Sequence, residues 1–411
     1  MKTAQVLVIG YVWPEPNSSA AGGRMMQLVQ LFKKQGWEVT FACPASESEH
    51  MSDLASIGIQ KAKIELNNES FDRFVAALNP TIVLFDRFMM EEQFGWRVAE
   101  HCPDAIRMID TVDLHFLRNA RQVALKEGRK MTQADLQSDM AKREIASILR
   151  SDLSLIISQY EMELLKETFR INVDLLYYLP LLVPSITETD MHTWLPFEER
   201  KDFVFIGNFL HEPNWNAVQY LKETIWPLIR KHLPKAELHV YGAYPPQKAM
   251  QMHKPAQGFY VEGRAEDAQA VVAKAKICLA PLRFGAGVKG KLAEAMQCGT
   301  PSVTTDIGAE GMSGNLPWNG AIANTPEEIA LSAVHLYTDV VAWKQAQQNG
   351  IKIINTRNAE SLHTEVLIDT IEASILDLNN RRSNNFIGSL LLHHTMTSTK
   401  YMSRWIEAKN K

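Results

Sequence analysis

The sequence has few cysteines, no long apolar runs and almost no net charge. Its four cysteines, at positions 43, 102, 278 and 298, show no C-x-x-C spacing, so they indicate neither a zinc site nor a disulfide framework. No apolar run approaches the roughly 18 residues of a membrane span. The 43 Lys and Arg against 47 Asp and Glu leave a net charge of -4, which gives no general attraction to nucleic acid. We therefore expect a protein of a reducing cytoplasm without a nucleic-acid partner.

Length and composition predict a folded protein of two domains. The 411 residues exceed the roughly 250 to 300 at which single hydrophobic cores stop growing. The 46% hydrophobic and 22% charged residues match ordinary globular chains and exclude collagen-like or disordered ones. The apolar run before Gly10 is too short for a signal-peptide core, so we expect it to form the first strand.

Short β-branched runs alternate with segments of helical period along the chain, which is typical of parallel sheets built from βαβ units. The predicted strands are AQVLVIG, EVTFACP, KAKIEL, TIVLFD, AIRMID, LSLIIS and DLLYYLP, then DFVFIGN, AELHVYG, FYVEG, AKICLAPL, TPSVTTD and GAIAN. Among the helices between them, the periodicity predicts one long helix from Leu117 to Leu149 and another from Pro326 to Asn349. The fold class is therefore α/β, with two doubly wound parallel sheets.

Domain boundaries follow from where this alternation stops. We place the N-terminal domain at 1–180, a proline-rich linker at 181–200 and the C-terminal domain at 201–378. A helical tail at 379–411 either caps the second domain or crosses back to the first. Parallel sheets bind ligands beyond the carboxyl ends of their strands, so two facing sheets predict a cleft between the domains.

The loop after the first strand has glycines directly before a helix. Gly22 and Gly23 allow close backbone approach, and the helix N-terminus followed by Arg24 suits an anionic group. An ordinary strand-to-helix turn explains the same residues equally well. The spacing is not the G-x-G-x-x-G dinucleotide fingerprint, so a nicotinamide cofactor is not indicated.

Ionisable residues gather after the fifth strand, in IDTVDLHFLR. Asp110, Asp113, His115 and Arg118 fall at the carboxyl edge of the sheet, where ligands bind. Asp110 as a helix cap and His115 as a surface residue remain the alternative. No pair here has a metal-ligand spacing, and we predict no metal and no cofactor.

The densest signal is APLRFGAGVKGKLAEAM, in the second domain. Glycines allow a tight turn before a helix whose first turn carries Lys289 and Lys291. Lysines there oppose the helix dipole unless an anion is bound, which a phosphate would explain. Glu294 follows one turn later on the same face, suited to accept hydrogen bonds from ribose hydroxyls. Two solvated lysines in an exposed turn are the alternative.

This segment resembles the donor-binding segment of retaining GT-B glycosyltransferases of family 4, especially bacterial exopolysaccharide and capsule sugar transferases. GNFLHEPNWNAVQYLKETIWPLI, LHVYG and VEGRAED are similar to that group and occur in its expected order. The resemblance covers almost the whole second domain, and in the first it rests on Gly22-Gly23-Arg24 and DTVDLHFLR. It implies the GT-B fold: two facing Rossmann-like domains with an interdomain cleft.

The resemblance also implies a role for each part of the site. Lys291 and the amides from Gly287 to Lys291 would hold the donor diphosphate, and Glu294 the ribose. His115 or Asp113 would contact the transferred sugar, while Lys291 with Arg24 would stabilise the leaving phosphate. The residues it assigns to donor binding are Gly22, Gly23, Gly207, Asn208, Gly242, Glu262, Gly263, Arg283, Gly285, Gly287, Val288, Lys289, Gly290, Lys291 and Glu294. One departure is Ala286, where family 4 enzymes commonly have a glutamate that contacts the donor sugar.

The implied activity is metal-independent transfer of a sugar, as in hexosyltransferases, from a nucleotide-diphosphate sugar to a hydroxyl, with retention of anomeric configuration. The acceptor would be a glycan, a lipid-linked sugar or a protein, in bacterial polysaccharide synthesis. The location would be the cytoplasm, with the inner face of the membrane as an alternative. A nucleotide-sugar epimerase of the same fold and a non-catalytic nucleotide-sugar binder are the competing hypotheses.

Overall fold

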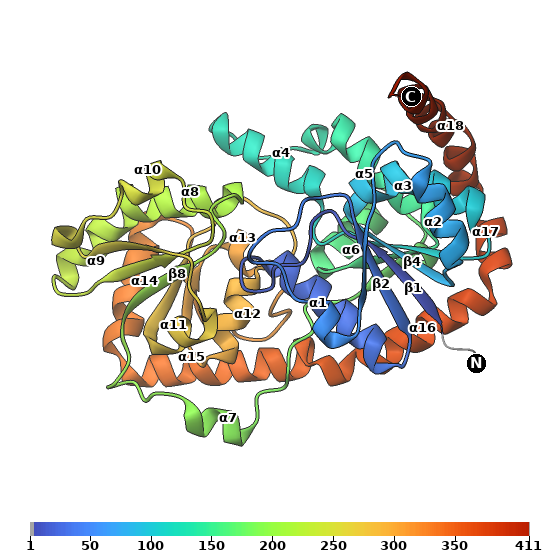
Figure 1. Ribbon diagram of the computed structural model, residues 1–411. Coiled ribbons are helices and arrows are strands. Elements are labelled where there is room, and N and C mark those ends of the chain that lie inside the picture. Colours follow the sequence, from blue (N-terminus) through green and yellow to red (C-terminus); the bar gives the residue numbers. More distant parts are fainter. Residues whose placement is uncertain (1–3, 411) are drawn as a thin grey trace.

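The computed structural model describes residues 4–410, which form two α/β domains side by side (Figure 1). The N-terminal domain is built on a parallel sheet of order β3-β2-β1-β4-β5-β6-β7. Its strands are β1 (Gln5–Ile9), β2 (Glu38–Cys43), β3 (Gln60–Lys63), β4 (Ile82–Asp86), β5 (Ile106–Asp110), β6 (Leu153–Ile156) and β7 (Leu176–Tyr178). β4, β5 and β6 are buried along their whole length, as parallel strands covered by helices on both faces are. The prediction of seven strands and a doubly wound sheet is confirmed.

Helices connect these strands and cover both faces of the sheet. They are α1 (Ala20–Lys34), α2 (Ser70–Leu78), α3 (Arg87–His101), α4 (His115–Lys126), α5 (Asp139–Arg150) and α6 (Gln159–Glu167). The single long helix predicted from Leu117 to Leu149 is wrong, because the chain breaks into α4 and α5. Gly128 adopts φ +66 just after α4, and the Ser138 hydroxyl accepts the Ala141 N–H to start α5.

The C-terminal domain has a parallel sheet of order β10-β9-β8-β11-β12-β13. Its strands are β8 (Lys201–Ile206), β9 (Leu238–Tyr241), β10 (Phe259–Gly263), β11 (Ala275–Ala280), β12 (Ser302–Thr304) and β13 (Gly320–Ile322). Its helices are α8 (Glu212–Tyr220), α9 (Trp226–His232), α10 (Gln247–Met250), α11 (Ala268–Lys274), α12 (Gly290–Gln297), α13 (Asp306–Ala309), α14 (Pro326–Thr338) and α15 (Val340–Ile353). All six predicted strands are confirmed. The helix predicted from Pro326 is divided at Asp339, whose carboxylate caps α15.

The end of the chain returns to the N-terminal domain. The linker carries α7 (Glu188–Thr193), and α15 is followed by α16 (Thr364–Leu376), α17 (Leu378–Asn384) and α18 (Phe386–Asn410) (Figure 1). Leu367 and Ile371 of α16 are buried in the same apolar core as β1. The crossing therefore occurs before α16, earlier than the predicted boundary at residue 378. Within residues 4–410, no helix combines the length and the hydrophobicity needed to span a bilayer.

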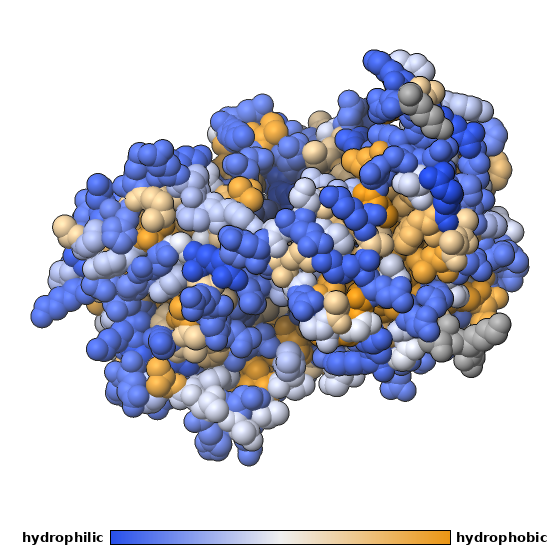
Figure 2. Space-filling model, in the orientation of Figure 1, coloured by the Kyte–Doolittle hydropathy of each residue, from blue (hydrophilic) through white to orange (hydrophobic). Residues whose placement is uncertain are grey.

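The two domains touch at the carboxyl ends of their strands. Arg121 of α4 donates to the carbonyl of Gly285 at 2.8 Å and to both oxygens of Glu310 at 2.8 and 2.7 Å. A Cβ added at Gly290, the first residue of α12, would lie 2.6 Å from Cβ of Ala20, the first residue of α1. Figure 2 shows a hollow with hydrophilic walls between the domains. The ligand edges of both sheets therefore meet at one place.

Candidate active site

The loop between β1 and α1 brings two glycines to this meeting point. A Cβ at Gly22 would lie 2.4 Å from the Glu15 carbonyl oxygen, so the turn requires glycine there. A Cβ at Gly23 would have no atom within 4 Å, so that glycine borders open space. The hydroxyl of Ser19 caps α1 by accepting the Gly22 N–H at 3.0 Å. Gly23 is half-buried, and its N–H donates to the Ser19 carbonyl at 3.0 Å.

Arg24 lies in a different environment from the one predicted. It is 1% exposed, and its Nε donates to both Asp110 oxygens at 2.9 and 3.0 Å. Its Nη1 donates to the carbonyls of Leu179 and Pro180 at 2.9 and 3.0 Å. The guanidinium therefore ties α1 to β5 and to the start of the linker. Its predicted contact with a phosphate is not supported, because its charge is already paired inside the domain.

Asp110→Asn is expected to destabilise the protein by about 3–5 kcal/mol, because it leaves the buried Arg24 charge without its partner. The loss is measured as the free energy of unfolding in denaturant. Asp139→Asn, which removes an exposed carboxylate on α5, is the matched control and should change stability little. Equal stability of the two variants would show that the Arg24–Asp110 pair does not hold the domain together.

Beyond β5, Asp113, His115 and Arg118 form one cluster. Arg118 donates a hydrogen bond to Asp113, and His115 Nε2 lies 3.4 Å from the Asp113 carboxylate. Burial would raise the pKa of Asp113, but the charges of Arg118, His115 and His211 outweigh it and hold the pKa well below its usual range. Burial lowers the pKa of His115 to about 4, against the attraction of Asp113, so the imidazole is neutral at pH 7. The predicted pair therefore lies together at the ligand edge.

The backbone entering this cluster is strained. Val112 has φ +62, a left-handed conformation that β-branched residues rarely adopt. A Cβ at Gly287 would lie 2.8 Å from Cβ of Asp113 and 3.2 Å from the Val112 carbonyl oxygen. The strained turn at Val112 thus packs closely against Gly287 of the other domain. Strain at a ligand edge is typical of functional sites.

Two buried glutamates that the sequence reasoning missed hold the start of α4. The Glu144 carboxylate accepts the N–H groups of His115 and Phe116 at 3.1 and 2.9 Å. Glu161 accepts the N–H of Leu114 at 2.9 Å and, across the domains, that of Gly287 at 2.8 Å. Burial raises the pKa of both carboxyls, to about 8 for Glu144. They position His115 through its backbone.

The raised pKa of Glu144 makes stability depend on pH. Between the ordinary pKa of 4.5 and about 8, the folded protein keeps a proton that the unfolded chain has lost, so stability falls as pH rises through this window. One such group contributes a slope of about 1.4 kcal/mol per pH unit. We expect Glu144→Gln to be less pH-dependent than the parent by about this slope between pH 5 and 8. Parallel curves from denaturant titrations would refute the assignment.

The glycine loop after β11 is held by the N-terminal domain. Gly287 donates its N–H to Glu161, so this amide is engaged, and the Gly285 carbonyl accepts from Arg121. Lys289 is 8% exposed and donates to the carbonyls of Ala286 and Gly287 at 3.1 and 2.6 Å. The Gly287 amide and the Lys289 ammonium are therefore engaged by other groups of the protein, and phosphate binding by this loop stays a prediction. Both residues stabilise the loop.

Ala286 and Val288, in the same loop, contribute to contacts between the domains. Ala286 is 7% exposed and packs in an apolar cluster with Leu114 and Ile156 of the N-terminal domain. Val288 packs in a second cluster that includes Ile157. A glutamate in place of Ala286 would bury its carboxylate among these apolar side chains. Ala286, the residue that departs from the family pattern, thus has apolar neighbours, which suit an alanine better than a glutamate.

Lys291 and Glu294 lie on the first turns of α12. The Lys291 Nζ donates to the amide oxygen of Asn214 at 2.7 Å and lies 5.2 Å from the centre of the Phe205 ring. Burial lowers its pKa to about 8, with the charge of Lys289 acting in the same direction. Burial also raises the pKa of Glu294 to about 7, opposed by Lys291. A partly buried cation without a carboxylate partner among the described residues is suited to bind an anion.

The loops after β8, β9 and β10 complete this side of the site. A Cβ at Gly242 would lie 2.2 Å from the Gly207 carbonyl oxygen, and one at Gly207 would lie 2.7 Å from the Asn214 side chain. The carbonyl of Asn208 accepts from the Asn214 amide at 2.9 Å, which connects this loop to Lys291. Contacts through Asn214 thus connect Gly207, Asn208 and Gly242 with Lys291, and their predicted roles at the phosphates and the base stay predictions.

The end of β10 carries Glu262 and Gly263, whose backbone is predicted to frame the base. Gly263 has φ +76 and open space where a Cβ would be, whereas the Glu262 side chain is bound to His239 at 2.7 Å. The next residue, Arg264, was missed; its Nε is buried and has no hydrogen-bond partner in the described chain. VEGRAED offered the signal, because a cation directly follows the glycine at a ligand edge.

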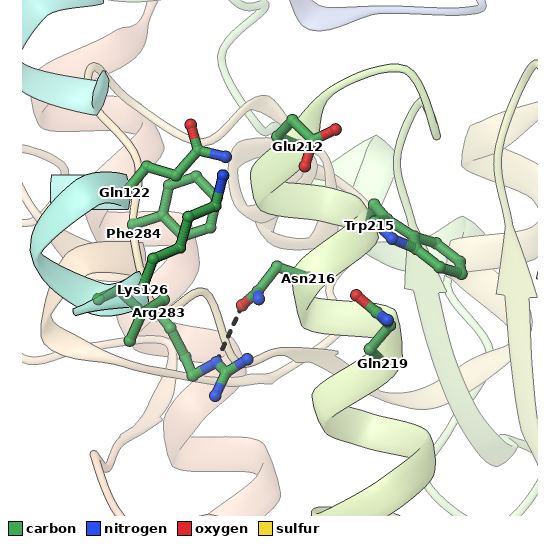
Figure 3. A pocket seen from close by; sticks show the side chains of 9 residues that line it. Gln122, Lys126, Glu212, Trp215, Asn216, Gln219, Arg283 and Phe284 are labelled. Atoms are coloured by element: carbon green, nitrogen blue, oxygen red, sulfur yellow. Dashed lines mark hydrogen bonds between the residues drawn. The ribbon is translucent and has the colours of Figure 1, made fainter. Parts of the chain in front are cut away.

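Arg283 lies at the outer end of the interdomain space. Its Nε donates to Asn216 of α8 at 2.9 Å (Figure 3). Its guanidinium lies over the Tyr220 ring at 4.5 Å. It lines a cavity of about 290 Å³ with residues of α4 and α8. Arg283 thus lines this cavity, and donor binding by Arg283 stays a prediction.

One cluster of metal-ligating residue types occurs among the described residues: Asp202, Glu237 and His239. They lie at the amino ends of β8 and β9, the edge opposite the candidate site. The groups that meet at the candidate site are instead two cations, the neutral imidazole of His115 and two carboxyl groups. The cations are Lys291 and Arg118, and the carboxyl groups are those of Asp113 and Glu294. This set suits stabilisation of negative charge on a phosphate group.

Comparisons with known proteins agree with this architecture. Two facing Rossmann-like domains that meet at their ligand edges define the GT-B fold. Residues 200–339 match the family model "Glycosyl transferases group 1". No curated protein matches the sequence of this chain. The matched segment and the fold together support the GT-B fold, with a second domain similar to that of group 1 glycosyl transferases.

Solved structures share the fold over nearly the whole chain. Sucrose-phosphate synthase from Thermosynechococcus elongatus has a TM-score of 0.65 at 14% identity, covering 90% of this chain and 100% of that one. HepE of Anabaena, solved in complex with UDP-glucose, has a TM-score of 0.65 at 11% identity, with 90% and 100% covered. A glycosyltransferase from Rickettsia africae has a TM-score of 0.65 at 11% identity, with 92% and 99% covered. At these identities the likeness establishes the fold alone.

Proposed function

We propose that the protein transfers a hexose-type sugar from a nucleotide-diphosphate sugar to an acceptor hydroxyl, with retention of anomeric configuration. The class of reaction is that of bacterial polysaccharide or glycolipid assembly, as in the family 4 enzymes that the sequence resembles. The acceptor would be a carbohydrate, free or on a lipid or protein, reached in the cytoplasm or at the membrane face. The bound UDP-glucose named for HepE supports a nucleotide sugar as donor.

One observation carries the proposal: Lys291 and Glu294 share one face of α12, opposite the Asp113–His115–Arg118 cluster of the other domain. Lys291 is a partly buried cation whose Nζ donates to the neutral Asn214 amide at 2.7 Å. Glu294 follows one helical turn later, placed for a ribose diol as Lys291 is for a diphosphate. A sugar attached to that diphosphate would extend toward His115.

In this mechanism, the acceptor hydroxyl approaches the anomeric carbon on the face from which the nucleoside diphosphate departs. The bond from the anomeric carbon to the phosphate oxygen breaks, the new glycosidic bond forms, and the leaving phosphate takes the acceptor proton. Lys291 stabilises the charge that develops on the phosphate. Neutral His115 orients a sugar hydroxyl, and Asp113 fixes the imidazole from 3.4 Å.

Activity is expected to survive chelation of metals. Lys291 and Arg118 supply positive charge at the site, so a divalent cation is not needed to neutralise the diphosphate. Release of nucleotide from the donor is measured with the chelator EDTA and with added Mg²⁺ or Mn²⁺, and the rates should agree within about twofold. Loss of turnover with EDTA and its restoration by Mn²⁺ would contradict the proposal.

Incubation with a panel of UDP-, GDP-, ADP- and dTDP-sugars tests the function. Slow hydrolysis of one donor to sugar and nucleoside diphosphate, with the same anomeric configuration by NMR, is expected of a retaining transferase without its acceptor. Conversion of the donor to its epimer would indicate the epimerase. Binding without any chemical change would indicate the non-catalytic binder.

A further inference from the structure

The two helices that begin at the candidate site, α4 and α8, continue away from it as the walls of a groove. Figure 3 shows Gln122 and Lys126 reaching from α4 toward Glu212 and Asn216 on α8, with Phe284 between them. The cavity measures about 290 Å³, near the lower limit of small-ligand pockets. Its position differs from that of Lys291 and Glu294, so the donor site does not account for it.

The groove is continuous with the reacting cluster. Arg118 and Gln122 are four residues apart on α4, so they lie on the same face, and Lys126 follows after four more. On α8, Glu212, Asn216 and Gln219 are four and three residues apart, so they also share one face of their helix. A molecule bound along these faces would present its end to His115 and Arg118.

The polar groups of the groove are available. The side chains of Gln122, Lys126, Glu212 and Gln219 make no hydrogen bond or ion pair with another side chain in the range 4–410. Asn216 holds the Nε of Arg283, and the two terminal nitrogens of that guanidinium have no acceptor among the described residues. The hydrogen bond from Arg283 to Asn216 thus fixes the position of the guanidinium, and the side chains around it have hydrogen-bonding groups available for a ligand.

The chemistry of these groups indicates the kind of ligand. A carboxamide both donates and accepts hydrogen bonds, as does each hydroxyl of a sugar, and three carboxamides line the groove. Glu212 and Arg283 can each bind two neighbouring hydroxyls. Leu125, which is half-buried, supplies an apolar surface for the C–H face of a ring, and the buried Phe284 ring lies beneath the groove. Two cations and one carboxylate leave little net charge, which favours a neutral ligand over a polyanionic one.

We propose that this groove between α4 and α8 binds the acceptor, as a neutral carbohydrate whose terminal hydroxyl faces His115. This inference rests on the proposed glycosyl transfer. Because one wall belongs to each domain, the subsite exists only while the domains are apposed. Arg121, which joins α4 to Gly285 and Glu310, holds that apposition beside the groove.

The test uses saturation-transfer NMR on the full chain with methyl glycosides of glucose, galactose, mannose and N-acetylglucosamine as probes. At least one glycoside should bind the parent protein. Gln122→Met and Gln219→Met keep the side-chain length and remove the amide, so each should raise its Kd roughly 3- to 10-fold. Gln348→Met, an exposed glutamine of α15, is the matched control and should leave Kd unchanged.

Nucleoside-diphosphate affinity, measured on the same variants, separates this proposal from the proposed function. Unchanged nucleotide affinity with weakened glycoside binding is the expected result. No glycoside binding by the parent protein, or equal glycoside affinity in all variants, overturns the acceptor groove even if nucleotides bind. The protein could also bind glycosides through Gln122 and Gln219 but show no affinity for any nucleotide. That result would support the carbohydrate site and overturn glycosyl transfer.

Discussion

Lys291→Ala is expected to lower nucleoside-diphosphate affinity about 10- to 150-fold, the equivalent of a lost charge-assisted hydrogen bond of about 1.5–3 kcal/mol. The reason is electrostatic. The lysine is held in the first turn of α12, where a cation opposes the helix dipole, and its neighbour there is the neutral Asn214 amide. Calorimetric titration measures the change. Lys352→Ala on α15, where the lysine is exposed, is the control.

Turnover and pH extend the test of Lys291. If the lysine also stabilises the leaving phosphate, turnover falls by a further factor, on the order of 100-fold. Its pKa, lowered to about 8 by burial, means that it loses its charge as pH rises, so parent affinity should fall above pH 8. The variant should lack this fall. Unchanged affinity in Lys291→Ala would remove the lysine from the site.

His115→Ala is expected to reduce turnover about 100-fold while nucleoside-diphosphate affinity changes less than about threefold, because a misplaced sugar reacts slowly even when its nucleotide is bound. The imidazole is neutral at pH 7 and packs edge-on against Phe88, with ring centres 5.6 Å apart. It is therefore a hydrogen-bonding group whose orientation is fixed. Steady-state kinetics with the donor, together with calorimetry, separates the two quantities.

Two further variants control the His115 result. His394→Ala, on the exposed face of α18, should turn over donor at the parent rate. His115→Asn keeps a hydrogen-bonding group and should recover part of the activity. If His115→Ala retains parent turnover and instead lowers the melting temperature, the residue packs against Phe88 without contacting substrate. No residue of the DTVDLH segment would then be assigned a catalytic role.

The sequence predicted the sheets better than the helices. Most of the thirteen strands are short runs rich in β-branched or aromatic residues followed by turn residues, and these signals are local. The long helix from Leu117 was wrong because helical periodicity continues on both sides of a break. The break itself was marked by Gly128 and by Ser138, a glycine after one helix and a cap before the next. Capping residues were the neglected signal.

For the candidate site, the sequence predicted the residues at strand ends but not their partners. Arg24 was expected to face an anion, and its anion is Asp110, 86 positions away in the same domain. Gly287 was expected to hold a phosphate, and its N–H is bound by Glu161 of the other domain. Such pairings depend on how distant segments pack, which residue spacing does not encode. The role of a charged residue at a ligand edge can therefore be assigned only after its neighbours in the fold are known.

Titration of the full chain with UDP, GDP, ADP and dTDP in a thermal-shift experiment tests the central claim, a nucleotide-diphosphate site on α12. One nucleotide should stabilise the parent protein by about 2.7 kcal/mol at a hundred times its dissociation constant. Glu294→Gln should shift that titration to higher nucleotide concentration, because the amide is a weaker acceptor for the ribose hydroxyls than the carboxylate. Stabilisation by none of the four nucleotides, or identical titrations of parent and variant, would contradict the account.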